Sequence, residues 1–157
     1  MTQKINICWL RRDLRLTDNA ALYHALKAEH PVLLLFIFDK NILDKLPDPN
    51  DARVTFIHQT LTRLNAELKD YHSGIEIKYG TPADCWIEIL KQYNVNAVFT
   101  NHDYEPYARE RDDMLAEYLA SENIGFKGYK DQVIFEKTEI LKADGKPYTV
   151  FTPFFKQ

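Results

Sequence analysis

The sequence predicts an α/β fold: a Rossmann-like, doubly wound sheet of about five parallel strands with helices on both faces. Short apolar runs, typical of strands, alternate along the chain with segments whose apolar residues recur every three or four positions, as in helices. The run VLLLFIF at 32–38 is apolar on both faces, which is typical of a central parallel strand. The 157 residues suit one domain with its own hydrophobic core.

Each apolar run ends in charge, proline or turn residues, which sets the limits of the expected elements. Strands are expected at residues 5–10, 32–38, 75–79, 97–100 and 126–130. The helices between them are expected at residues 19–29, 51–71, from 82 onward and 105–122, with a loop at 39–50.

Two helix starts can be predicted from capping chemistry. Asp18 is expected to cap the first helix, with Leu22, Ala25 and Leu26 on its inner face. Thr81 is expected to cap the third helix, because Pro82 follows it in the first turn. In that helix Ile87, Leu90 and Trp86 are expected to face the core.

Composition excludes several classes of protein. The net charge of −3 argues against an overall basic surface, so this segment should bind DNA weakly and in a salt-dependent way. Cys8 and Cys85 are the only two cysteines and lack paired spacing, which excludes a disulfide scaffold and a cysteine-rich zinc site. No apolar run approaches the roughly 20 residues of a membrane span, and no signal peptide is evident. A cytoplasmic location without a membrane partner is expected.

Several catalytic and phosphate-binding motifs are missing from the sequence. There is no G-x-G-x-x-G after the first strand, no P-loop and no G-x-S-x-G elbow. The chain has five glycines, too few to favour a glycine-rich phosphate loop. Its histidines lack the spacing of a metal site, so no metal is expected, and nothing around Asp103 and Glu105 indicates a general acid or base.

A binding site is expected beyond the carboxyl ends of the strands, near the point where the strand order reverses. Polar residues gather in the loops of that edge, and arginines and acids together suit a ligand with planar donors and acceptors. A salt-bridge network that ties the loops together is the alternative. The candidates in and after these loops are Asp39, Arg53, Asn101, Asp103 and Glu105.

Three segments resemble signatures of the photolyase/cryptochrome family, in the same order and at similar separations. They are WLRRDLRLTDNAAL at 9–22, NHDYEPYARERD at 101–112 and YTVFTPFFK at 148–156. The resemblance implies that residues 1–140 are the N-terminal α/β antenna domain. Residues 141–157 would begin the linker to a C-terminal helical domain, absent here, that carries FAD.

The resemblance also implies an activity for the full-length protein. It would be a deoxyribodipyrimidine photo-lyase, a carbon–carbon lyase that splits cyclobutane pyrimidine dimers in damaged DNA by electron donation from reduced FAD. Its partners would be damaged DNA and the C-terminal domain. The present segment would be an inactive monomer without FAD.

Family members carry a folate, a deazaflavin or a flavin mononucleotide as antenna pigment, and some carry none. Folate-type members have an Asn-Glu pair where this chain has Tyr107 and Ala108, so a folate is less expected. A flavin-type ring, deazaflavin or FMN, is favoured. The residues that resemble the deazaflavin pocket are Arg12, the backbone at Ile37 and Phe38, Arg53, Asp103 and Glu105.

The charged loop at 11–18 divides into different expected roles. Arg12 is expected to contact the pigment, whereas Asp13, Arg15 and Asp18 are expected to tie loops and cap a helix. Arg11 remains open between a domain-interface role and exposure to solvent.

Two other functional classes remain open. A cryptochrome, a light-signalling protein without repair activity, would share the same N-terminal sequence pattern. A nucleotide-binding α/β module of the universal-stress or electron-transfer-flavoprotein kind would share the sheet, but the absence of a glycine-rich loop counts against it.

Overall fold

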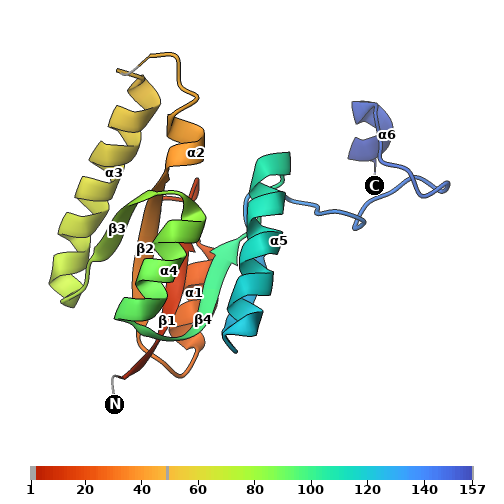
Figure 1. Ribbon diagram of the computed structural model, residues 1–157. Helices are drawn as coiled ribbons and strands as arrows, with labels where there is room; N and C mark the ends of the chain where they lie inside the picture. Colours follow the sequence, from red (N-terminus) through yellow and green to blue (C-terminus); the bar gives the residue numbers. More distant parts are fainter. Residues whose placement is uncertain (1–2, 49, 157) are drawn as a thin grey trace.

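The computed structural model describes residues 3–48 and 50–156, and its centre is one sheet of five parallel strands in the order β3-β2-β1-β4-β5 (Figure 1). This arrangement confirms the predicted Rossmann-like α/β fold. The strands are β1 Lys4–Leu10, β2 Val32–Asp39, β3 Ile75–Gly80, β4 Asn94–Asn101 and β5 Gly125–Tyr129.

The helices lie on both faces of the sheet, with α4 and α5 on the face toward the viewer in Figure 1 and α1 and α3 on the other. No helix in the described part of the chain is long and apolar enough to cross a membrane. The helices are α1 Ala20–Lys27, α2 Lys40–Leu43, α3 Ala52–Leu68, the 3-10 turn η1 Lys69–Tyr71, α4 Pro82–Gln92, α5 Pro106–Ser121 and α6 Phe151–Phe155.

The sheet separates two hydrophobic cores because successive side chains of a strand point to opposite faces. Trp9 of β1 packs with α4 on one face, where its ring meets Trp86 edge to face at 5.6 Å. Cys8 and Leu10 pack on the other face with residues of α1 and α3, among them Leu61. Both faces are therefore covered, as a parallel sheet requires.

The start of α1 differs from the prediction by one residue. Asn19, not Asp18, is the N-cap, and its side-chain oxygen accepts from the backbone N–H of Leu22 at 3.1 Å. Asp18 instead adopts a left-handed backbone conformation with φ of 52°. Leu26 is 65% exposed, so its predicted inward position is wrong: the inner face of the short helix is used by Ala21, Leu22 and Ala25.

The predictions for the segment 39–50 and for one inner residue of α4 need correction, whereas the predicted cap of α4 is confirmed. The segment 39–50 contains the short helix α2, which Asp39 caps by accepting from the backbone N–H of Asn41 at 2.9 Å. Ile87 of α4 is exposed, and the buried position belongs to Ile89. The cap at Thr81 is confirmed.

An aromatic cluster occupies the last described residues. Phe154 of α6 contacts Phe135 and Tyr148 with ring centroids 6.0 and 6.3 Å apart. Phe151 and Phe155 stack on each other and are 71% and 74% exposed. In Figure 1 α6 stands apart from the sheet and its helices, so these rings are not part of either core.

The two thiols should be unreactive in the folded protein. Burial, with a smaller effect of Asp13, raises the pKa of Cys8 to about 12, and burial also raises the pKa of Cys85. Because the thiolate is the reactive form, a disulfide reagent at about pH 8 should label neither thiol until denaturant is added. Rapid labelling of Cys8 in the native protein would contradict its place in the core.

The exposed rings of α6 predict concentration-dependent association of this chain. A contiguous apolar patch is seldom left open in a monomer, so the chain should be monomeric when dilute and associate as its concentration rises. Deleting residues 148–157 should abolish this association in sedimentation experiments. If the deletion leaves sedimentation unchanged, the aromatic cluster is satisfied within one molecule.

Candidate functional site

A cleft of about 770 Å³ opens at the carboxyl ends of β1, β2 and β4. It lies where the strand order reverses, because β1 has β2 on one side and β4 on the other. Open α/β sheets bind ligands at this position, and small-molecule sites typically span roughly 300–1,000 Å³. The cleft is therefore in the predicted place and large enough for a planar ring system.

One side of the cleft is apolar. The end of β2 contributes the predicted Ile37 and Phe38, and α2 and α3 complete the wall. Phe56 of α3 is 67% exposed at the rim, where it could cover a bound ring. The apolar lining comprises Trp9, Phe36, Ile37, Phe38, Ile42, Leu43, Leu46, Ala52, Val54, Phe56, Ile57 and Ala108.

An arginine and two acids form the polar side of the cleft. Arg12 forms ion pairs with Glu105 at 2.7 Å and with Asp103 at 3.4 Å. The side chains of Arg12 and Glu105 are mostly exposed, whereas that of Asp103 is 10% exposed. The hydrogen bond to Glu105 raises the pKa of Arg12, so its guanidinium stays charged. The three predicted residues therefore converge.

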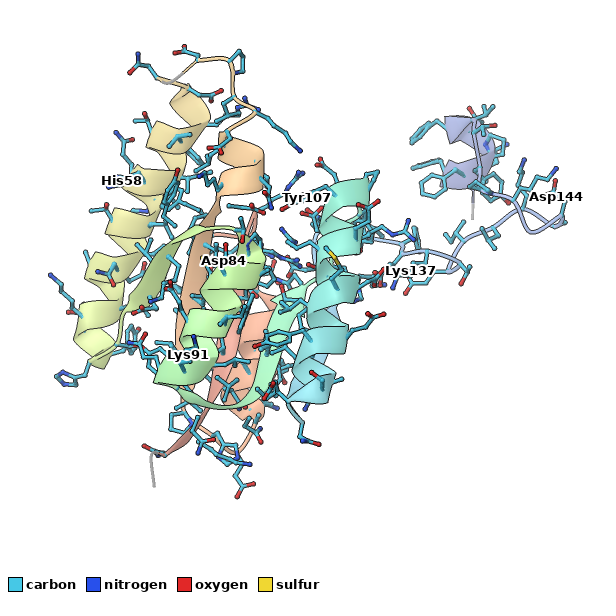
Figure 2. All side chains as sticks on the ribbon, in the orientation of Figure 1. His58, Asp84, Lys91, Tyr107, Lys137 and Asp144 are labelled. Atoms are coloured by element: carbon cyan, nitrogen blue, oxygen red, sulfur yellow. The ribbon has the colours of Figure 1, made fainter. Side chains whose placement is uncertain are left out.

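Asp39 and Tyr107 close the side of the cleft between β2 and α5. The hydroxyl of Tyr107 donates to Asp39 at 2.6 Å, and the side-chain amide of Asn41 donates to the Tyr107 oxygen at 3.1 Å. Burial, together with the bond to Asp39, raises the pKa of Tyr107, so the phenol remains a donor. Figure 2 shows Tyr107 on the side of α5 that faces α2. Since both its oxygens already accept hydrogen bonds, the predicted site residue Asp39 acts here as a link between elements.

Arg53 lines the rim and has a partner that the sequence reasoning missed. Its guanidinium binds Asp51 with N–O distances of 2.6 and 2.9 Å. Asp51 also caps α3 by accepting from the backbone N–H of Arg53. The Arg53 side chain is 71% exposed, so it can still reach a ligand at the mouth of the cleft.

Asn101 does not line the cleft, in contrast to the prediction. It is 5% exposed, and its side chain is used in structural hydrogen bonds. Its oxygen accepts from the backbone N–H of Ala21 at 2.8 Å, and its nitrogen donates to Asp13 at 2.6 Å and Asn19 at 3.0 Å. Asn101 therefore ties the end of β4 to the start of α1.

Arg11, which the sequence left open between an interface role and solvent, is buried. Its guanidinium donates to both carboxylate oxygens of Asp112 at 2.6 Å and also to the backbone oxygen of Asn101. Arg111 shares the same carboxylate at 2.9 Å, and both guanidiniums lie over the ring of Trp9. Burial lowers the pKa of Arg11, and the charge of Asp112 opposes this effect.

Trp9, Arg11 and Arg111 line the inner end of the cleft, and sequence reasoning did not select them. The motif that contains Arg111 was recognised, but the motif alone does not show which of its charges turn inward. The contact of Arg111 with Trp9 joins residues 102 positions apart in the chain, so only the folded chain reveals it.

Asp13 and Arg15 of the first loop are structural, as predicted. Arg15 binds Asp131 at 2.6 Å and the backbone oxygen of Asp18 at the same distance. Asp131 also accepts from the backbone N–H of Ala20 at the start of α1. This network links the first loop to the segment that follows β5.

Replacing Asp112 should destabilise the fold strongly. Asp112→Ala leaves two buried guanidiniums without their shared carboxylate, and breaking a buried pair costs about 3–5 kcal/mol. The melting temperature should fall by roughly 2–4 °C per kcal/mol in a chain of this size. Asp113→Ala, at an exposed neighbouring position of α5, is the matched control. Equal melting temperatures of the two variants would show that the Arg11 cluster contributes little.

Comparison with known proteins relates these features to one family. The sequence profile of the DNA photolyase family matches residues 6–157. A deoxyribodipyrimidine photo-lyase from Synechococcus sp. is 34% identical over 148 residues, which are 94% of this chain and 30% of the relative. Cryptochrome-2 of Arabidopsis thaliana is 30% identical over 98% of this chain and 25% of its own length. The chain therefore spans about a third or less of these relatives.

Solved structures agree with the fold. A bacterial class III photolyase from Agrobacterium tumefaciens has a TM-score of 0.85 at 24% identity, covering 99% of this chain and 32% of that one. An archaeal photolyase from Sulfolobus tokodaii, described with two FAD molecules that imply a novel light-harvesting cofactor, has a TM-score of 0.78 at 29% identity. That match covers 87% of this chain and 32% of the other. Since the family profile covers nearly the whole chain, the chain belongs to the DNA photolyase family, as an N-terminal photolyase/cryptochrome domain.

Proposed function

We propose that this domain binds an antenna pigment with a flavin-type ring, deazaflavin or FMN, in the cleft at the ends of β1, β2 and β4. The full-length protein would be a deoxyribodipyrimidine photo-lyase that uses light to split cyclobutane pyrimidine dimers in damaged DNA. One observation carries the proposal: a single cleft of about 770 Å³ combines an apolar wall with an exposed arginine and two acids.

The two sides of the cleft suit the two parts of a flavin-type ring. Such a ring has an apolar body and a uracil-like edge of alternating donors and acceptors. The body would lie against the end of β2 and beneath Phe56, while the edge would face Arg12 and Asp103. An arginine can only donate and an ionised carboxylate can only accept, so together they match the carbonyls and the N–H of that edge.

The comparison with Sulfolobus tokodaii photolyase supports a flavin as a candidate ligand. That protein is described with two FAD molecules, which are said to imply a novel light-harvesting cofactor. We place the catalytic FAD of the present protein outside these residues, in a C-terminal helical domain. FAD itself joins deazaflavin and FMN as a ligand to test in the cleft, because all three present a similar fused ring.

A folate is disfavoured by what occupies the start of α5. Tyr107 and Ala108 stand where folate-type members have Asn and Glu, and Tyr107 is already bound to Asp39. The same hydrogen bond closes that side of the cleft. A folate would therefore lose both of its expected polar partners here.

Residues 141–157 would connect the antenna domain to the C-terminal helical domain. The exposed rings of Phe151 and Phe155 supply an apolar surface for such a contact. The second candidate function is that of a cryptochrome. The similarity to Arabidopsis thaliana cryptochrome-2 supports this candidate. The loss of pyrimidine dimers under blue light, measured on the full-length protein, would distinguish a repair enzyme from a cryptochrome.

Removing the polar side of the cleft should weaken pigment binding without unfolding the protein. A hydrogen bond to a charged group contributes roughly 1.5–3 kcal/mol, so Asp103→Ala and Arg12→Ala should each raise the Kd by about tenfold or more. Asp103 is 10% exposed, but its partner Arg12 is 57% exposed and also pairs with Glu105, so in Asp103→Ala water and Glu105 replace the lost contact, which should cost about 0–1 kcal/mol. The melting temperature should therefore change by at most about 4 °C.

The measurement is a fluorescence titration with deazaflavin, FMN, FAD and folate, combined with thermal melts. Arg63→Ala, an exposed arginine of α3 that does not line the cleft, is the control and should bind like the wild type. Absence of binding by every flavin-type ring, together with marked destabilisation of the Asp103 and Arg12 variants, would identify the cluster as a structural salt-bridge network.

A further inference from the structure

The loop after β4 presents its side chains alternately to two sides of the domain. Asp103 and Glu105 turn toward the cleft, where both pair with Arg12. His102 and Tyr104 turn the other way and both contact Glu136, in the segment that follows β5. Residues 102–105 are consecutive, so holding the side chains of His102 and Tyr104 also restricts the backbone that carries the two acids.

The far side of this loop is a second hollow of about 420 Å³ between α5, β5 and the segment after β5. His102, Tyr104 and Lys137 contribute to its walls, and Asp103 borders this hollow as well as the first cleft. Figure 2 shows Lys137 on the side of α5 away from Tyr107 and the first cleft. The loop thus forms a partition between the candidate pigment site and the segment that leads away from the sheet.

His102 is held from three directions. Its backbone N–H donates to the backbone oxygen of Tyr129 at 2.7 Å, and its ring nitrogen Nδ1 contacts the carboxylate of Glu136. The imidazole also lies in the space above Gly128, where the Cβ of any other residue would overlap it. The ring therefore has little freedom to move while Glu136 is in place.

Tyr104 provides the second contact to the same carboxylate. Its hydroxyl donates to Glu136 at 3.0 Å, and the Glu136 side chain is 12% exposed. Burial and the hydrogen bond to Glu136 raise the pKa of Tyr104 to about 12, so the phenol remains a donor at neutral pH. One largely buried carboxylate therefore anchors two alternate residues of the loop.

We propose that Glu136 is a positioning residue of the pigment site: it holds His102 and Tyr104, and so fixes the acids that alternate with them. Glu136 itself would never touch the pigment. The segment 131–139 and the pigment would then stabilise each other, because coupling between two binding events is reciprocal. The functional part of this inference rests on the proposed pigment site, whereas the ordering of the loop by Glu136 does not.

The first measurement needs no pigment. Glu136→Ala should speed amide hydrogen exchange of residues 102–105 by about tenfold, the factor expected from the loss of one or two net hydrogen bonds. Glu136→Gln keeps an oxygen that Tyr104 can donate to, so it should lie between the wild type and the alanine variant. Asp144→Ala is the matched control, since this carboxylate accepts from the N–H of Lys146 in a local turn, and it should exchange like the wild type.

The second measurement is the Kd of the flavin-type ring that the wild type binds. Glu136→Ala should raise it about three- to tenfold, while Asp144→Ala leaves it unchanged. Gly128→Ala tests the contact between His102 and Glu136 without changing Glu136. The added methyl group displaces the His102 ring and removes no charge. It should reproduce both effects.

The outcomes separate this inference from the proposed function. If the wild type binds no flavin-type ring, the pigment site fails, and exchange alone decides whether Glu136 orders the loop. If the wild type binds a ring and the Glu136 and Gly128 variants match it in both exchange and Kd, the positioning role is overturned. Weaker binding with unchanged exchange would also overturn it, because Glu136 would then act by a route other than the loop.

Discussion

The cleft depends on one buried ion pair, between Arg11 at the end of β1 and Asp112 of α5. Asp112 draws Arg111 to the same point, and the two guanidiniums cover the ring of Trp9. Parallel strands end in free backbone groups at the carboxyl edge, so the position of each loop there has to be set by side chains. Arg11 fixes two such positions, because it binds Asp112 of α5 and also the backbone oxygen of Asn101 at the end of β4.

The charges of the first loop thus divide by burial into two groups with different roles. Arg11 is 8% exposed and bound to a carboxylate that is itself mostly buried. Arg12, the next residue, is 57% exposed and bound mainly to an exposed acid. A buried pair cannot release its partner without a large desolvation cost, whereas an exposed pair exchanges partners at little cost. A ligand can therefore recruit Arg12 and leave the Arg11 cluster intact.

The fold could be predicted from the sequence because the central strands are continuous apolar runs and the helices between them have apolar residues every three or four positions. Signals confined to a few residues were less informative: Asp18 and Asn19 are equally good caps, and the four residues of α2 are too few to show a period. At the site, the sequence placed Arg12, Asp103 and Glu105 together correctly. It could not separate Asn101 from them, because polarity does not reveal which side chain will be buried against Ala21 and Asp13.

The same limit explains why the role of Glu136 is invisible in the sequence. Its partners His102 and Tyr104 lie more than 30 positions earlier, and its own segment has no regular structure. Only the parallel pairing of β4 with β5 brings the loop and this segment to one edge, and only Gly128 leaves room there for the imidazole. The loop after β4 therefore lies between Arg12, which binds its two acids, and Glu136, which binds His102 and Tyr104. The two partners bind different side chains and do not compete with each other. That separation would allow a pigment and the segment after β5 to bind it at the same time and to favour the same geometry.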